Sequence, residues 1–207
     1  MMAANTARSI RADLQLIADM IEPHSRLLDV GCGDGTLLEY LDRHKHVDGR
    51  GIEISTQGVD ACVSAGLSVI QGNADTDLAD YPDQAFDYVV LSQTLQAVQA
   101  PKTVLGHLLR IGRRAIVSFP NFAYWRLRWN LAARGRMPVS NSLPYQWYET
   151  PNIHFCTIKD FVELCDAMGI TIERSISLDH KGTMRRIGSI VFFANLFGEH
   201  AVFLLSK

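Results

Sequence analysis

The run Leu-Leu-Asp-Val-Gly-Cys-Gly-Asp-Gly, residues 27–35, constrains this chain more than any other feature of its sequence. It joins a short apolar stretch to three glycines at alternate positions, Gly31, Gly33 and Gly35. An acidic residue, Glu53, follows 22 positions after Gly31, at the end of a second apolar stretch. A strand, a glycine-rich turn and a later acid are typical of a site that holds a ribose at the carboxyl ends of parallel strands. The sequence therefore predicts a parallel sheet with a nucleotide-like ligand at its edge.

The remaining apolar pattern extends this sheet along the chain. Strands are predicted at residues 26–30, 50–54, 67–71, 86–91, 115–119, 170–178 and 201–205. Helices are predicted at residues 8–21, 36–41, 56–65, 101–109, 121–136 and 157–168. Alternating strands and helices imply right-handed crossovers and a mostly parallel sheet. We expect one domain over residues 1–207, with residues 122–156 as a cap or insertion after the fifth strand.

Bulk composition limits the class of protein. The chain has 207 residues, of which 47% are hydrophobic and 20% charged, as expected for one soluble globular domain. A net charge of −2 argues against strong attraction to nucleic acids or membranes. The four cysteines have neither metal-ligand spacing nor a disulfide framework, and the N-terminal residues lack a signal-peptide core. We therefore expect a cytoplasmic protein with reduced thiols and no metal.

Asp29 indicates the charge of the expected ligand. It stands two residues before Gly31, and the glycine spacing is G-x-G-x-G rather than the G-x-G-x-x-G of dinucleotide sites. A carboxylate at this point would repel a pyrophosphate but attract an ammonium or sulfonium group. S-adenosylmethionine offers both cations together with a ribose for Glu53. The alternative is that Asp29 caps the next helix and the glycines only form a tight turn.

Residues 27–35 also resemble motif I of the class I S-adenosylmethionine-dependent methyltransferases, and Glu53 resembles their ribose-binding acid. Residues 71–75 resemble their adenine-contacting loop, with Asn73 where many members have Asp and with Asp75 as an alternative carboxylate. The resemblance implies a Rossmann-like fold with a seven-stranded, mostly parallel sheet and helices on both faces. It implies S-adenosyl-L-methionine or S-adenosyl-L-homocysteine as cofactor, bound by Asp29, Gly31, Cys32, Gly33, Gly35, Glu53, Ile54, Asn73, Ala74, Asp75, Ser92 and Gln93.

A narrower resemblance covers the chain from about Arg11 to Lys207. Residues 90–96, 118–122, 144–155 and 195–199 are similar to the MetW family of methionine-biosynthesis proteins. That similarity implies an association with a homoserine O-acyltransferase of the MetX type, whose activity the chain would support. A retained S-adenosylmethionine pocket would then suit a sensor of the end product.

Catalysis by the chain itself is the alternative. Methyl transfer to oxygen, nitrogen or carbon usually uses a positioned base. Ser92, Gln93, Gln96 and Ala97 follow the fourth strand, and none is a base near neutral pH. His154 is a weak catalytic candidate, and the competing interpretation is a structural hydrogen bond that fixes its loop over the site. A thiolate acceptor needs no base, so a small-molecule methyltransferase stays open as a function.

The charge is unevenly distributed. Residues 88–148 contain no Asp or Glu, but they contain Lys102 and seven arginines. Aromatic residues and arginines are enriched at protein interfaces, and helical spacing places Trp125 beside Trp129. Arg128 is expected next to Trp125, with Arg126 on a different side of the helix. These four residues form the predicted partner surface; the alternative is a solvated basic face with the tryptophans turned into the core. If residues 122–156 instead form a lid over an empty pocket beside the methyl group of the cofactor, the methyltransferase function is favoured.

Overall fold

An eight-stranded sheet runs through the computed structural model, which describes residues 10–140, 142–188 and 191–207. The order across the sheet is β3-β2-β1-β4-β5-β8-β6-β7. The strands are β1 (Arg26–Val30), β2 (Asp48–Glu53), β3 (Ser68–Gln71), β4 (Phe86–Ser92), β5 (Gly112–Pro120), β6 (Thr171–Leu178), β7 (Met184–Arg186) and β8 (His200–Ser206). The pairings among β1 to β5 are parallel, and the pairings of β8 with β5 and β6 and of β6 with β7 are antiparallel.

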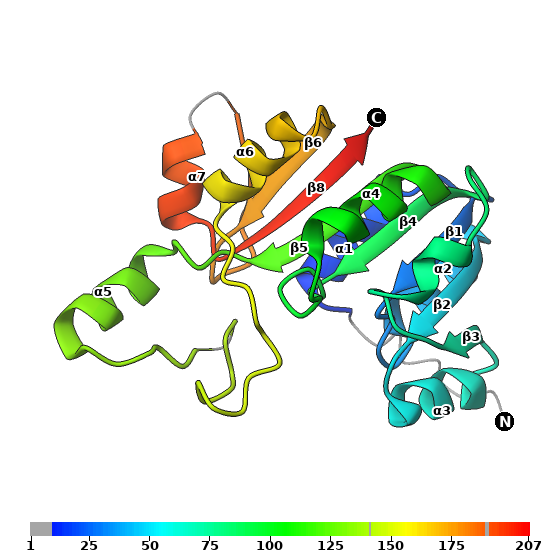
Figure 1. Ribbon diagram of the computed structural model, residues 1–207, viewed down its shortest axis with the longest axis horizontal. Coiled ribbons are helices and arrows are strands. Elements are labelled where there is room, and N and C mark those ends of the chain that lie inside the picture. The colour runs from blue at the N-terminus through cyan, green and yellow to red at the C-terminus, as the bar shows by residue number, and fades with distance from the viewer. Residues whose placement is uncertain (1–9, 141, 189–190) are drawn as a thin grey trace, which may run out of the picture.

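Helices connect these strands, and most of them cover the sheet. They are α1 (Ala12–Met20), α2 (Thr36–Lys45), α3 (Thr56–Ser64), the 3₁₀ helix η1 (Asp77–Asp80), α4 (Pro101–Ile111), α5 (Trp125–Arg134), α6 (Ile158–Ala167) and α7 (Val191–Phe197). Helix α5 stands apart from the sheet, joined to it by extended segments (Figure 1). Among the described residues, no helix is both long enough and apolar enough to cross a membrane.

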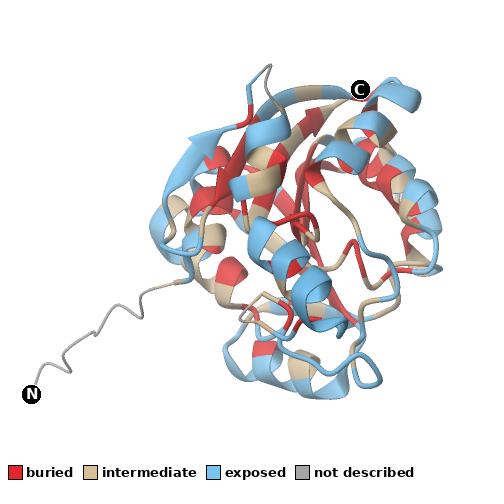
Figure 2. Cartoon of the chain, turned by 90° about the vertical axis from the view of Figure 1, so that its left-hand side faces the viewer, coloured by how far each residue is buried: buried red, intermediate tan, exposed pale blue. Residues whose placement is uncertain are grey.

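The central strands are buried on both faces because their side chains alternate between two cores. In β1, Leu28 packs with the residues of α4 and α6, while Leu27 packs with those of α1 and α2. In β4, Val89 and Val90 divide in the same way. Burying one such side chain contributes about 1.5–3 kcal/mol. Figure 2 shows buried residues concentrated along the strands, as the apolar runs of the sequence predict for a parallel sheet.

The structure departs from the predicted elements near the C-terminus. The sheet has eight strands rather than the seven expected, because β7 pairs with β6 as an edge hairpin. Its three residues are all exposed, so the sequence has no alternation of apolar and polar residues there that would predict a strand. Helices α7 and η1 were also not predicted; α7 is seven residues long and apolar at every position but Asn195, so it shows no helical alternation of apolar and polar residues. The predicted helix 8–21 begins at Ala12, and residues 8 and 9 of that prediction lie outside the described residues.

Asn121 fixes the point where the chain leaves the sheet for α5. The residue is fully buried at the end of β5. Its Nδ2 donates to the carbonyl oxygens of Asn195 and Gly198, both at 2.8 Å. Its Oδ1 accepts from the backbone nitrogens of Ala123 at 3.1 Å and Ile158 at 3.3 Å. One side chain thus ties β5 to the starts of α5 and α6 and to the end of α7. The turn it forms explains why α5 begins at Trp125 rather than at residue 121.

We predict that Asn121→Ala lowers the free energy of unfolding by about 3 kcal/mol, because it leaves several buried backbone groups without partners. Urea unfolding followed by circular dichroism measures the loss. Asn130→Ala is the matched control, since the Asn130 side chain on α5 makes no hydrogen bond within the described residues. Equal stability of the two variants would contradict the role assigned to Asn121.

Candidate functional site

The glycine turn after β1 leaves open space at the carboxyl edge of the sheet. Gly31, Gly33 and Gly35 all have positive φ, which side chains other than glycine rarely adopt. A Cβ atom at Gly31 would lie 2.6 Å from Thr94 Oγ1, so the turn packs closely against the loop after β4. A Cβ atom at Gly33 would meet no protein atom within 4 Å. A ligand can therefore approach the backbone at Gly33, before the N-terminus of α2.

Glu53 clamps this turn from the end of β2. Its Oε2 accepts a hydrogen bond from Gly33 N at 2.9 Å, and its Oε1 accepts one from Ser55 N at 2.9 Å. The backbone carbonyl of Ile52 also accepts from Gly31 N. A carboxylate oxygen can accept a second hydrogen bond. The predicted ribose contact is therefore compatible with the clamp.

Asp29 is a buried carboxylate with an unsatisfied oxygen. Only 2% of the residue is exposed, and Oδ1 has no hydrogen-bond partner among the described residues. Burial and, to a smaller extent, the nearby charge of Glu53 together raise the pKa of Asp29 from 3.8 to about 7. An ammonium or sulfonium group brought to this point would supply the missing partner and favour the charged form. These observations fit the cationic ligand predicted from the sequence.

The loop after β3 is ordered by its own side chains. Asn73 Oδ1 accepts from Asp75 N at 2.9 Å, and Asn73 N donates to Asp77 Oδ2 at 2.8 Å. The Asp75 carboxylate accepts from the backbone nitrogens of Gln99 and Ala100 at 3.0 Å, at the start of α4. Asp75 therefore anchors the loop to α4. The side-chain nitrogen Nδ2 of Asn73 has no hydrogen-bond partner among the described residues, so it can donate to a ligand. Ala74 is partly buried against the core.

The other expected cofactor residues lie at the same edge. Ser92 Oγ is 3.1 Å from Ser118 Oγ, and Gln93 has a φ of 54°. A non-glycine residue at positive φ is uncommon and often marks a functional position. Cys32 Sγ lies 3.9 Å from Cys62 Sγ inside the core, and burial raises the pKa of the Cys32 thiol, so it is an inert packing group. The side chain of Ile54 is exposed beside Glu53.

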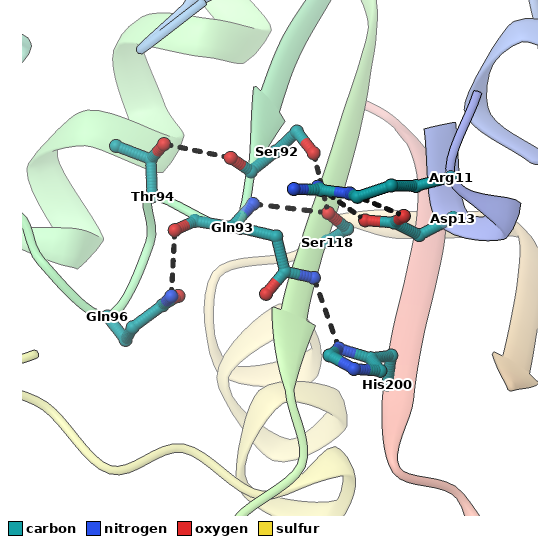
Figure 3. A network of polar contacts seen from close by, with 8 residues as sticks. All are labelled: Arg11, Asp13, Ser92, Gln93, Thr94, Gln96, Ser118 and His200. Atoms are coloured by element: carbon teal, nitrogen blue, oxygen red, sulfur yellow. Dashed lines mark hydrogen bonds and ion pairs between the residues drawn. The ribbon is translucent and has the colours of Figure 1, made fainter. Parts of the chain in front are cut away.

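His200 was missed by the sequence analysis. It opens β8 and pairs with Pro120 at the end of β5, and its Nδ1 lies 3.3 Å from Gln93 Nε2 (Figure 3). Burial lowers its pKa. Because Gln93 Nε2 is the donor, Nδ1 accepts, and the proton of the neutral ring sits on Nε2. No local motif connects the two residues, which are 107 positions apart.

A cleft of about 870 Å³ opens beside Gln93 and His200. Its walls come from the loop after β4, the start of α5, the segment after α5, the β6–β7 hairpin and the N-terminal end of α1. Of the predicted cofactor residues, only Gln93 lines this cleft. The cleft is therefore next to the glycine turn but separate from it.

His154 holds the segment after α5 against the loop after β4. Its Nε2 lies 3.3 Å from the carbonyl oxygen of Gln99. The backbone nitrogens of Ile153 and His154 both donate to the Gln96 carbonyl oxygen, at 2.9 and 3.0 Å. These contacts are those of the structural alternative considered for His154, and His154 is not among the residues that line the cleft.

Helix α5 presents its tryptophans to solvent. Trp125 is 42% exposed and Trp129 is 69% exposed, so the alternative that placed them in the core is wrong. The guanidinium of Arg126 lies over the Trp125 ring, 5.5 Å from its centroid, whereas Arg128 Nε donates to the carbonyl oxygen of Ala123. The expectation that Arg126 lies on a different side of the helix from Trp125 is therefore wrong, and Arg128 satisfies a carbonyl oxygen at the start of the helix. Outward-facing tryptophans were expected of a partner surface, and an open pocket was expected of a methyltransferase. The structure has both features, so they do not discriminate between these two functions.

We predict that Asp29→Asn stabilises the ligand-free protein more at about pH 8 than at about pH 5. The folded pKa of about 7 exceeds the ordinary 3.8, so the folded chain holds more protons between these values. The stability of the wild type therefore falls as pH rises through this window, and the variant lacks that fall. Urea midpoints across the pH range measure the difference, and a gap that stays constant would refute the assignment.

Comparison with known proteins places this geometry in a family. The family model of the methionine biosynthesis protein MetW matches residues 11–205. The bifunctional methionine biosynthesis protein MetXA/MetW of Rhodopirellula baltica is 36% identical over 180 residues, covering 83% of this chain. The chain spans 29% of the length of that relative.

Solved structures show the same fold. A SAM-dependent methyltransferase of Thermotoga maritima matches with a TM-score of 0.68 and 17% identity, over 95% of this chain and 87% of that one. An S-adenosylmethionine-dependent methyltransferase of Mesorhizobium loti matches with a TM-score of 0.67 and 15% identity, over 95% of this chain and 98% of that one. The fold is thus the Rossmann-like methyltransferase fold predicted from the glycine turn, and the chain belongs to the MetW family of methionine-biosynthesis proteins.

Proposed function

We propose that this chain binds S-adenosylmethionine and partners a homoserine O-acyltransferase of the MetX type, whose activity it supports. The observation that carries the partnership is the relative named as a bifunctional MetXA/MetW protein. Fusion holds two domains at a high effective concentration, which suits parts that act together. The unsatisfied oxygen of Asp29 and the Glu53 clamp support the cofactor.

In this proposal Asp29 Oδ1 accepts a hydrogen bond from the ammonium group of the cofactor, and Glu53 accepts from its ribose. The open backbone at Gly33 accommodates the ligand, and Asn73 donates to the adenine edge. The S-adenosyl cofactor would supply a charged, adenosine-bearing signal of end-product abundance. The chain contributes a site that is selective for that charge, because an unpaired buried carboxylate is costly without it.

The partner surface comprises Trp125, Arg126, Arg128 and Trp129. Further exposed aromatic side chains follow it along the chain, at Tyr145, Trp147, Tyr148 and Phe155. Soluble monomers rarely expose so many large aromatic residues in one segment unless the segment binds something. The absence of Asp and Glu from residues 88–148 favours a partner that presents carboxylates around an apolar centre.

Contacts join the cofactor site to this surface. Thr94 packs against the glycine turn at Gly31. Two residues later, the Gln96 carbonyl oxygen accepts hydrogen bonds from the backbone of Ile153 and His154. A ligand that shifts the glycine turn would therefore bias the segment after α5 through the loop at residues 93–99. This route gives S-adenosylmethionine a physical means to alter the affinity for the acyltransferase.

A methyltransferase acting on a small molecule is the second candidate function. The observation that favours it is the cleft beside Gln93, which carries a histidine, His200, at the edge where methyl acceptors would reach the cofactor. Accumulation of S-adenosylhomocysteine in reactions that contain an acceptor would support this candidate.

The sensor role predicts that S-adenosylmethionine changes the rate of homoserine acylation when this chain is present. The assay uses the acyltransferase encoded by the same genome and a titration of the cofactor. Asp29→Asn should raise the concentration for half-maximal effect at least about tenfold, because it removes the charge that pairs with the cation. Asp60→Asn, on the exposed face of α3, is the matched control. An unchanged titration in Asp29→Asn would refute the sensor role.

The partner surface makes a separate prediction. Trp129→Ala should weaken binding to the acyltransferase by about 2 kcal/mol, or about thirtyfold, as expected for a buried interface tryptophan. Biolayer interferometry with immobilised acyltransferase measures the affinity. Phe192→Ala is the control, because Phe192 is equally exposed, at 67%, but lies on α7. If the two variants bind alike, the surface has been assigned to the wrong helix.

A further inference from the structure

The cleft beside the cofactor site carries two charged side chains that the fold does not use. The Glu199 carboxylate makes no hydrogen bond or ion pair with the described residues. The Arg126 guanidinium lies over the ring of Trp125 and makes no hydrogen bond or ion pair with the part of the chain that the structure describes. The other charges in the walls are satisfied: Arg11 is paired with Asp13, and the Asp179 carboxylate accepts from the backbone of its own turn.

Two further polar residues, Tyr124 and His200, line the same cleft. Tyr124 is only 3% exposed, and burial raises the pKa of its hydroxyl. Arg126 lowers that pKa, whereas Glu199 and Asp179 raise it. The charge of Glu199 also raises the pKa of His200, against the larger lowering by burial. Glu199 directly precedes His200 in the chain, Arg126 follows Tyr124 by two residues at the start of α5, and all four residues line the cleft.

Gln96 provides an independent sign of a ligand. It is 6% exposed and lines the cleft, and its Oε1 has no hydrogen-bond partner among the described residues. Its Nε2 donates to the Gln93 carbonyl oxygen at 2.7 Å. Figure 3 shows Gln93 linking Gln96 on one side to His200 on the other. A buried acceptor without a donor is costly, and a ligand that donates a hydrogen bond would satisfy it.

A zwitterion matches this set of groups better than a single ion does. A phosphate or carboxylate alone would leave Glu199 unpaired, and an amine alone would leave Arg126 unpaired. The Arg126 fork suits a carboxylate, and Glu199 suits an ammonium group. The low pKa of His200 keeps its ring neutral, so it adds no charge to the balance.

We propose that this cleft binds a free α-amino acid, with its carboxylate at Arg126, its ammonium group at Glu199 and its side chain toward Gln96 and His200. The proposal goes beyond the cofactor and the acyltransferase, and it depends on neither. The walls of the cleft include the start of α5 and the segment after it. An amino acid bound there would contact the segment that carries the partner surface.

The test uses the full chain alone, in the absence of acyltransferase and cofactor. The twenty standard L-amino acids and L-homoserine are screened by thermal shift at about 10 mM, and each hit is titrated by calorimetry. At least one should bind saturably. The amine that lacks the carboxylate and the hydroxy acid that lacks the ammonium group should each bind at least about tenfold more weakly.

Two variants assign the charges. Arg126→Met should weaken the amino acid at least about tenfold but leave the amine unaffected, and Glu199→Gln should weaken both. Arg134→Met, at the other end of α5, is the control for loss of a positive charge. Circular dichroism and the melting temperature without ligand show that each variant folds. The proposal is overturned if no amino acid binds, if the amine binds as well as the amino acid, or if neither variant changes the affinity.

Discussion

The parallel pairing of β1 with β2 on one side and β4 on the other determines where the glycine turn, Glu53 and Gln93 of the proposed cofactor site lie. Parallel strands end at the same edge of a sheet, so the glycine turn, Glu53 and Gln93 converge although they are distant in the chain. The pairing also buries Asp29, because β1 is covered on both faces. The site is therefore built from the most constrained part of the fold.

Asp29 illustrates the conflict between stability and ligand binding. A carboxylate buried without a partner destabilises the folded chain above its ordinary pKa, and its pKa of about 7 reflects that cost. Stability alone would favour an amide or an apolar residue at this position. The proposed cationic ligand would offset the penalty, so the same charge that weakens the free protein would make the bound state selective.

Asn121 fixes the junction where the chain leaves the sheet for α5. Its four hydrogen bonds to backbone groups join β5, α5, α6 and α7. Helix α5 buries little of its own surface, with Leu127 as its buried residue, so its position depends on the junction at its start. The cleft lies between this junction, the loop after β4 and the first residues of β8. Contacts among the described residues thus connect the proposed cofactor site to the cleft, and the cleft to the helix that carries the exposed tryptophans.

The sequence by itself determined the parallel core, the glycine turn and Glu53, because these depend on local periodicity and on a spacing that one βαβ unit fixes. The place of Ser92 and Gln93 at the edge of the sheet was also predictable, since β4 is a buried apolar run. Tertiary structure decided what depends on distant pairing. His200 reaches Gln93 only because β8 inserts antiparallel between β5 and β6, and Arg126 rather than Arg128 lies over Trp125 because Arg128 satisfies the Ala123 carbonyl. The edge strand β7 could not be predicted from the sequence, because an exposed strand buries no apolar face and therefore shows no apolar pattern.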